Sequence, residues 1–252
     1  MREQESGSSR TKVQVRHLTK KFGDLLVLDD ISFDVEKGDL LCVVGPTGCG
    51  KTTFLNSLTR IYDITSGEIL LDGHPVDPKK DNIAYIFQGN STMPWLTVEQ
   101  NVAFGLDIKH TPQKKRQELV EKYLDIVGLT KYRSYYPKQL SASMLQRVSI
   151  ARAFATEPEL LLMDEPYGQL DIELRFKLED ELIRLWQMTG TTVLFITHNI
   201  EEAVYLGEHI MILTKPTTVK QTLENHLPRP RDIAAPEFVQ LREQVTELIK
   251  WW

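Results

Sequence analysis

The sequence predicts an α/β fold with a mainly parallel, doubly wound sheet. Short apolar runs typical of buried strands alternate along the chain with amphipathic helical patterns, and this alternation is typical of parallel sheets. The run GPTGCGKTT at 45–53 lies between an apolar run and a helix-forming segment, which is the strand–loop–helix context of a phosphate-binding loop. The length of 252 residues suits one large α/β domain or two small ones.

The composition excludes several classes of protein. With 41% hydrophobic and 26% charged residues, the chain is typical of soluble globular proteins. Its net charge of −5 indicates no nucleic-acid partner. Residues 1–11 lack the apolar core of a signal peptide and are expected to form a flexible tail. No apolar run approaches the roughly 18 residues of a membrane span, and Cys42 and Cys49 are expected to be reduced, cytosolic thiols.

The expected strands are short and apolar or alternate in polarity. In the second of them, Ile31, Phe33 and Val35 alternate with polar residues, so one face is expected to be buried. The strands are expected at residues 13–18, 30–35, 39–44, 68–73, 82–88, 160–165, 191–198 and 209–214.

The expected helices carry apolar residues three or four positions apart. Asn199 is expected to cap one of them, with Glu202 completing a capping box. The charged run at 173–184 is expected to be a solvated helix face. Residues 89–157 are expected to be a helical insertion between core strands. The helices are expected at residues 53–60, 116–128, 146–155, 173–190, 199–207 and 236–252.

The phosphate-binding loop fits the pattern G-x-x-x-x-G-K-[ST], with Gly45, Gly50, Lys51 and Thr52 in the fixed places. Glycines let backbone N–H groups converge on phosphate oxygens, and the following helix N-terminus adds its positive end. Lys51 is placed to reach the β- and γ-phosphates, and the Thr52 hydroxyl to hold Mg²⁺. The expected nucleotide contacts are Gly45, Pro46, Thr47, Gly48, Cys49, Gly50, Lys51, Thr52 and Thr53.

Four polar residues at expected strand ends suit hydrolysis of a phosphate bond. In LLLMDEP at 160–166, Asp164 is placed to support Mg²⁺ and Glu165 to act as general base for an attacking water. His198 could contact the terminal phosphate and orient Glu165, and Gln88 could contact Mg²⁺ or the water. Taken alone, a histidine at a strand end is more often structural, and a single glutamine is as often structural as functional. The prediction therefore depends on these residues lying together.

These features together resemble the ATP-binding subunits of ABC transporters, over about residues 12–252. The resemblance implies ATP and Mg²⁺ as cofactors, stacking of adenine on Phe22, and a contact to ATP from Asp171 in the D-loop-like GQLD. It also implies a P-loop NTPase (RecA-like) fold with an N-terminal antiparallel β part and an inserted helical subdomain. The motifs that carry it are KKFG, GPTGCGKTT, Gln88, LLLMDEP, GQLD and THNIEEA, in that order.

The same resemblance divides the chain into parts. It implies one ATPase domain, with the nucleotide-binding core at 12–88 and 158–218. The helical subdomain with the signature motif would cover 89–157, and a C-terminal extension and helix would cover 219–252.

The signature motif departs from the family pattern. The family has LSGGQ or LSGGM, which covers the γ-phosphate held by a second, head-to-tail subunit; this chain has LSASMLQRVSIARA at 140–153. Ser141 can still bond phosphate, but Ala142 and Ser143 replace two glycines and add Cβ atoms. Both are small and begin a helix whose N–H groups can face the anion. Two outcomes stay open: slower or partner-dependent hydrolysis, or no effect.

The chain resembles subunits of importers rather than family members that act on DNA or ribosomes, because it has one ATP domain and no very long insertion. The partners implied are a second ATP-binding subunit, identical or different, transmembrane permease subunits and, indirectly, a solute-binding protein. Such subunits lie peripherally on the cytoplasmic face of the cell membrane, held through the permease. The segment after Gln88 resembles their docking surface, with Met93, Trp95 and Leu96 expected to be exposed; a buried Trp95 is the alternative.

Three segments are most similar to importers of nitrate, sulfonates and taurine: PWLTVEQNVAFGL, MDEPYGQLD and LPRPRD at 227–232. The implied function is to power import of such a small anion. One alternative is an ATP-dependent dimerisation switch without transport, and another is a weakly active subunit of a heterodimeric ATPase pair. A P-loop kinase is disfavoured because it leaves the signature and THNIEEA unexplained. The remaining histidines are expected at the surface: His17, His74, His110, His209 and His226.

Overall fold

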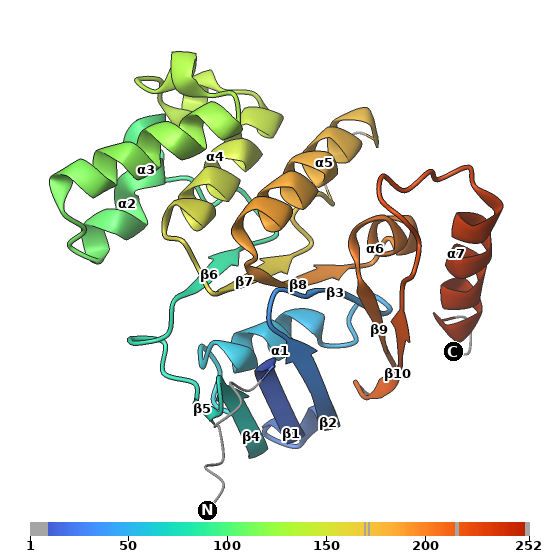
Figure 1. Cartoon of the computed structure of the whole chain (residues 1–252). Helices are drawn as coiled ribbons and strands as arrows, with labels where there is room; N and C mark the ends of the chain where they lie inside the picture. Colours follow the sequence, from blue (N-terminus) through green and yellow to red (C-terminus); the bar gives the residue numbers. More distant parts are fainter. Residues whose placement is uncertain (1–9, 169, 171, 215–216, 250–252) are drawn as a thin grey trace, which may run out of the picture.

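The structure is a computed structural model that describes residues 10–168, 170, 172–214 and 217–249. It is layered: a four-stranded antiparallel sheet, helix α1 (Lys51–Leu58), a six-stranded sheet, and a group of helices on the far side of that sheet (Figure 1). The predicted α/β fold with a mainly parallel sheet is confirmed. Residues 1–9 of the expected flexible tail lie outside the described residues. Thr11, also expected in the tail, belongs to strand β1 (Thr11–Phe22).

The central sheet has the strand order β10-β9-β3-β8-β7-β6. Strand β3 pairs in parallel with β8 and β9, and β7 pairs in parallel with β8 and β6, while β10 is antiparallel to β9. The carboxyl ends of the parallel strands therefore meet at one edge, where α/β proteins bind ligands. The bounds are β3 Leu40–Val44, β6 Ile83–Ile86, β7 Leu160–Asp164, β8 Thr192–Thr197, β9 His209–Leu213 and β10 Val219–Glu224.

The antiparallel sheet has the order β2-β1-β4-β5. Its strands are β1 Thr11–Phe22, β2 Leu25–Glu36, β4 Ser66–Leu71 and β5 His74–Pro75. Strand β2 is longer than the expected 30–35 because β1 and β2 form one continuous hairpin that reverses after Phe22. Ile31 and Val35 are buried, as their alternation predicts.

The helices outside α1 are α2 Val98–Ile108, α3 Gln113–Ile126, α4 Ala142–Ala155, α5 Ile172–Thr189, α6 Ile200–Leu206 and α7 Pro236–Ile249. Helix α4 begins at Ala142 rather than at 146, because the Ser141 side chain caps it by accepting from the Met144 backbone N–H. Helices α2, α3 and α4 pack together as the expected helical insertion (Figure 1). In the described part of the chain, no helix is long and apolar enough to cross a membrane.

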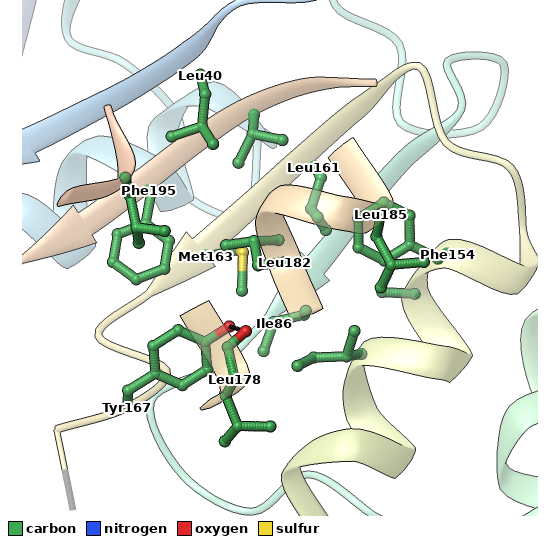
Figure 2. Packing of buried hydrophobic residues seen from close by; sticks show 14 of the residues in the cluster. Leu40, Ile86, Phe154, Leu161, Met163, Tyr167, Leu178, Leu182, Leu185 and Phe195 are labelled. Carbon is green, nitrogen blue, oxygen red and sulfur yellow. Dashed lines mark hydrogen bonds between the residues drawn. The ribbon is translucent and has the colours of Figure 1, made fainter. Parts of the chain in front are cut away.

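Two hydrophobic cores lie on opposite faces of the central sheet. On one face, Phe54, Leu55 and Leu58 of α1 fill the space between the two sheets. On the other face, the leucines of α5 pack against the strands, with Tyr167 beneath them (Figure 2). The sequence predicts a stripe of Leu174, Leu178, Leu182 and Leu185 on this helix; the last three are fully buried, and Leu174 is partly buried. The two cores fix α1 and α5 relative to the strand ends that carry the polar residues.

Four sequence expectations are wrong in detail. Strand β10 lies within the expected C-terminal extension; its mostly exposed side chains gave no apolar pattern. His209 is partly buried and contacts Asp39 at 2.8 Å instead of lying free at the surface. Glu179, in the run expected to be solvated, is buried. Asn199 caps α6 as predicted, but Glu202 is buried rather than reaching back to the cap.

Candidate active site

The phosphate-binding loop connects β3 to α1 in a conformation that requires glycine. Gly48 and Gly50 have φ values of 76° and 101°, which other residues rarely adopt. A Cβ atom on Gly50 would lie 2.8 Å from both the Val27 Cγ1 and the Thr217 Oγ1 atoms. Among the described residues, no side chain caps α1 and no acid lies in its first turn. The N-terminus of α1 therefore keeps its positive end for an anion.

Lys51 is held at the centre of this loop. Its side chain is only 5% exposed, and Nζ donates to the Gly45 and Pro46 carbonyl oxygens at 3.0 and 3.2 Å. Nζ also lies 3.6 Å from Glu165 Oε1. The carbonyl groups orient the ammonium without neutralising it, so a buried positive charge faces the loop. This arrangement fits the polyphosphate of a nucleotide.

Glu165 is the centre of a polar cluster at the strand ends. His198 Nδ1 lies 2.8 Å from Glu165 Oε2, and Gln88 Nε2 donates to the same oxygen at 3.3 Å. Glu165 itself has a φ of 44°, a strained conformation of the kind found at functional sites. The structure thus brings together Gln88, Glu165 and His198 after β6, β7 and β8, as the sequence predicts. Their catalytic roles stay predictions.

Asp164, at the end of β7, is buried next to α1. Burial raises the pKa of its carboxyl group, while a hydrogen bond from Thr52 favours the charged form. Within the described residues, no group of three or more His, Cys, Asp or Glu side chains could hold a metal. Mg²⁺ often binds one or two protein oxygens together with phosphates and water, so the Asp164 and Thr52 donor set fits this ion.

Phe22 lies at the tip of the β1–β2 hairpin, and its side chain is 43% exposed. The ring packs edge-on against Tyr62, with centroids 5.4 Å apart, and Lys20 Nζ lies 4.6 Å from the Phe22 centroid. The same hairpin brings Val27 against Gly50 of the loop. An exposed ring near the phosphate loop can stack on a base. Sequence reasoning missed Lys20 and Tyr62, since no pattern joins them to Phe22.

The signature residues form a separate surface at the start of α4. Ser141 and Ala142 are exposed, and Ser143 is partly exposed. The Ser141 and Ser143 hydroxyl oxygens lie 3.0 Å apart. In the part of the chain that the structure describes, no hydrogen bond or ion pair joins these residues to the loop at 45–53. Asp171, the remaining expected contact, lies outside the described residues.

Two polar side chains from neighbouring helices hold the backbone of the expected docking segment after Gln88. Asn101 of α2 is buried and bonds the Met93 backbone in both directions, with N–O distances of 2.8 and 3.1 Å. Arg152 of α4 donates to the carbonyl oxygen of Ser91 at 2.8 Å. Trp95 is 71% exposed, so the buried alternative is wrong. Sequence reasoning missed Asn101 and Arg152, although each is a polar residue within a helix of the insertion.

Two expectations about this segment need correction. Met93 and Leu96 are partly buried rather than exposed, because the turn that presents Trp95 folds back onto α2 through the Asn101 side chain. A single aromatic side chain, rather than three apolar ones, therefore dominates the exposed surface.

The comparisons with known proteins show the family of this chain. The model of the ABC transporter family matches residues 28–168. The chain is 40% identical over 246 residues to an uncharacterized ABC transporter ATP-binding protein of Methanocaldococcus jannaschii, covering 96% of this chain and 92% of that protein. It is 38% identical over 237 residues to an aliphatic sulfonates import ATP-binding protein of Bacillus cereus, covering 94% and 93%. The chain belongs to the ABC transporter ATP-binding family.

Solved structures agree as well. A dimeric ATP-binding cassette bound to ADP and phosphate superposes with a TM-score of 0.75 at 29% identity, covering 85% of this chain and 99% of that one. The CbiO1 protein of Clostridium perfringens, described as part of the ABC transporter complex CbiONQ, gives a TM-score of 0.80 at 22% identity, covering 95% of this chain and 98% of that one. The latter supports the fold alone. The protein is accordingly an ATP-binding ATPase of the transport-associated class, as the sequence predicts.

Proposed function

We propose that this chain is the ATP-hydrolysing subunit of an importer for a small anion such as a sulfonate, taurine or nitrate. The relative named for aliphatic sulfonate import aligns over nearly its whole length. The segments at 94–106, 163–171 and 227–232 resemble the same group of importers. The residues of this chain bind and hydrolyse ATP, and the permease and solute-binding partners select the solute.

The observation that carries the hydrolytic role is the geometry around Glu165. Its Oε2 atom is held by Gln88 and His198, while Oε1 lies towards Lys51 at 3.6 Å. Oε1 is therefore the oxygen that takes a proton from an attacking water, and the two neighbours hold the carboxylate in place. Lys51 binds the β- and γ-phosphates. Thr52, Asp164 and Gln88 would hold Mg²⁺, which would neutralise phosphate charge.

The proposed assembly uses two further surfaces. In a head-to-tail dimer, Ser141, Ala142, Ser143 and Asp171 cover the nucleotide held by the second subunit, as the similarity to a dimeric cassette supports. Trp95 anchors a cytoplasmic helix of the permease, since an exposed aromatic side chain on a rigid turn suits an interface anchor. The chain then lies peripherally at the cytoplasmic face of the membrane, and the solute-binding protein acts through the permease.

Purification with the membrane partners tests this proposal. We expect the tagged chain to copurify with a multi-span permease from solubilised membranes. In vesicles with the cognate binding protein, ATP hydrolysis should rise when a sulfonate, taurine or nitrate is added. The Trp95→Ala chain should no longer copurify with the permease. An ATPase that dimerises but recruits no membrane protein would instead support the dimerisation switch. Native mass spectrometry of the complex distinguishes a homodimer from a pair with a different ATP subunit.

A further inference from the structure

Glu179 of α5 is a buried acid that the site described above leaves without a role. The residue is 1% exposed, and in the described structure neither carboxylate oxygen has a hydrogen-bond donor. It follows Leu178, whose carbonyl oxygen accepts a hydrogen bond from the buried Tyr167 hydroxyl at 3.3 Å (Figure 2). An ionised carboxylate in such surroundings is strongly disfavoured.

Glu179 interacts with a second buried acid, Glu202 of α6. The two side chains line one cavity, and a proton on one of them removes the repulsion between two buried negative charges. Burial and the negative charge of Glu202 raise the pKa of Glu179 to about 9. Burial raises the pKa of Glu202 as well, while Thr197 and Arg175 favour its charged form. The proton therefore belongs to Glu179, which donates it to the Glu202 carboxylate.

The pair also supports the turn that carries His198. The Thr197 hydroxyl bonds Glu202 and accepts from the Asn199 backbone N–H at 2.9 Å. Arg175, Asn199 and Glu202 line two cavities. One, of about 170 Å³, also touches Glu165 and His198, and the other, of about 180 Å³, also touches Glu179. A change at the acid pair thus acts on the wall of the catalytic cavity.

We propose that Glu179 keeps a proton at neutral pH and shares it with Glu202, and that this acid pair positions the turn bearing His198. Glu179 and Glu202 are positioning residues, since neither reaches the reacting atoms. The consequence for hydrolysis rests on the role of His198 proposed above, whereas the shared proton does not.

Other titratable groups around the pair come from several elements. Burial holds the pKa values of Tyr167 and Cys42 well above their usual range, and it also raises the pKa of Tyr205. These three groups stay neutral at physiological pH. The groups facing the pair are Arg175, Asp180 and Glu181 of α5, Tyr167 before α5, Cys42 of β3, His198 before α6, and Tyr205 of α6.

The raised pKa sets the direction of the pH dependence. The folded chain keeps the Glu179 proton up to a pH of about 9, whereas the unfolded chain releases it near the ordinary value of 4.5. Stability is therefore highest below 4.5 for this group and falls as the pH rises through this window. Above about 9, two adjacent charges repel each other and the turn bearing His198 loosens.

Glu179→Gln tests the proposal, because the amide keeps a donor to Glu202 and cannot titrate. Between pH 6.5 and 9, the Tm of the wild-type chain should fall by roughly 5 °C or more relative to Glu179→Gln. The exposed Glu173→Gln on the same helix has the same charge change and should follow the wild type. Infrared spectra of the wild type should show a protonated-carboxyl band at pH 7.5 that disappears by pH 10 and is missing in Glu179→Gln.

The pH profile of ATP hydrolysis tests the positioning role. Wild-type activity should fall at least threefold between pH 8 and 9.5, and Glu179→Gln should remove most of that fall. If no protonated-carboxyl band depends on Glu179, the shared proton is disproved whether or not the chain hydrolyses ATP. If the band is present but the two activity profiles coincide, the positioning role is disproved. A wild-type chain without ATPase activity contradicts the proposed function, while the band still decides the shared proton.

Discussion

The two surfaces expected to enclose ATP differ in how firmly this chain holds them. On the phosphate-loop side, Lys51 and Glu165 are 5% and 16% exposed, and each has contacts to neighbouring elements. On the signature side, Ser141 is exposed, and among the described residues its hydrogen bonds reach Ser143, Met144 and Leu145 of the following helix. The difference fits the proposal that the residues for ATP binding and proton transfer lie within one subunit. In that proposal, the signature surface acts on the nucleotide of a second subunit.

The largest expected effect is on the phosphate-loop side, at Glu165, the predicted general base. Glu165→Gln keeps the shape and removes the proton acceptor, so hydrolysis should fall about 100-fold or more. ATP binding should persist, because Lys51 keeps its carbonyl partners, and an ATP-bound dimer should accumulate. Steady-state ATPase assays and native mass spectrometry measure both. The matched control is Glu173→Gln, an exposed acid on α5; turnover near wild type in Glu165→Gln would show that another group is the base.

The phosphate contact gives the next largest effect. Lys51→Ala should weaken ATP binding at least tenfold, since a charged hydrogen bond contributes roughly 1.5–3 kcal/mol. Its two carbonyl partners can bond water instead, so the fold should persist. Equilibrium titration measures the affinity and circular dichroism the fold, with Lys177→Ala on the surface of α5 as control. An unchanged affinity would contradict the assignment of the loop.

These residues were predictable because short, contiguous motifs carry them. A strand that ends in Asp164 and Glu165 and a glycine-rich loop each place their side chains by local geometry, and a parallel sheet brings the strand ends to one edge. Glu179 was not predictable in this way. It lies next to the apolar stripe of α5 in a run of charges, and tertiary packing buries it beside Glu202 of α6. Burial of a charged residue depends on tertiary neighbours that a helical pattern does not specify.

The same limit applies to other parts of the chain. Asn101 and Arg152 hold the docking turn from two different helices, and Tyr62 reaches Phe22 from beyond α1. Each contact joins residues far apart in the sequence. Strand β10 pairs at a sheet edge with mostly exposed side chains, so its sequence lacks the alternation that revealed β2.

A smaller effect is expected at Phe22, the residue predicted to stack on adenine. Phe22→Ala should weaken ATP binding about 5-fold or more, since stacking on an aromatic ring contributes roughly 1–3 kcal/mol per base. Binding of tripolyphosphate, which has no base, should not change, and Phe22→Trp should restore ATP affinity. Leu25→Ala, at the paired position across the hairpin, is the control. Equal losses for ATP and tripolyphosphate would show that Phe22 supports the loop rather than the base.

The smallest expected effect is on the signature side. If crowding slows the reaction there, Ala142→Gly with Ser143→Gly should raise ATPase activity about threefold, a change of about 0.7 kcal/mol in the barrier. ATP affinity of the isolated monomer should stay the same, because the phosphate loop is untouched. Glycine in the first turn also weakens α4 slightly, which limits the gain.

The Ser141–Ser143 contact makes this last test sharper. Ser143→Gly removes a Cβ atom and also frees the Ser141 hydroxyl from its neighbour at 3.0 Å, whereas Ser143→Ala frees the hydroxyl and keeps the Cβ. Crowding predicts a gain for the glycine variants alone, and competition for the Ser141 hydroxyl predicts a gain for Ser143→Ala as well. In a heterodimer, only the nucleotide site of the other subunit should respond. The contrary result is a homodimer that turns over ATP briskly, at a rate that none of these variants changes. That result would show that Ala142 and Ser143 are neutral replacements and that the difference between the two surfaces does not affect the rate of hydrolysis.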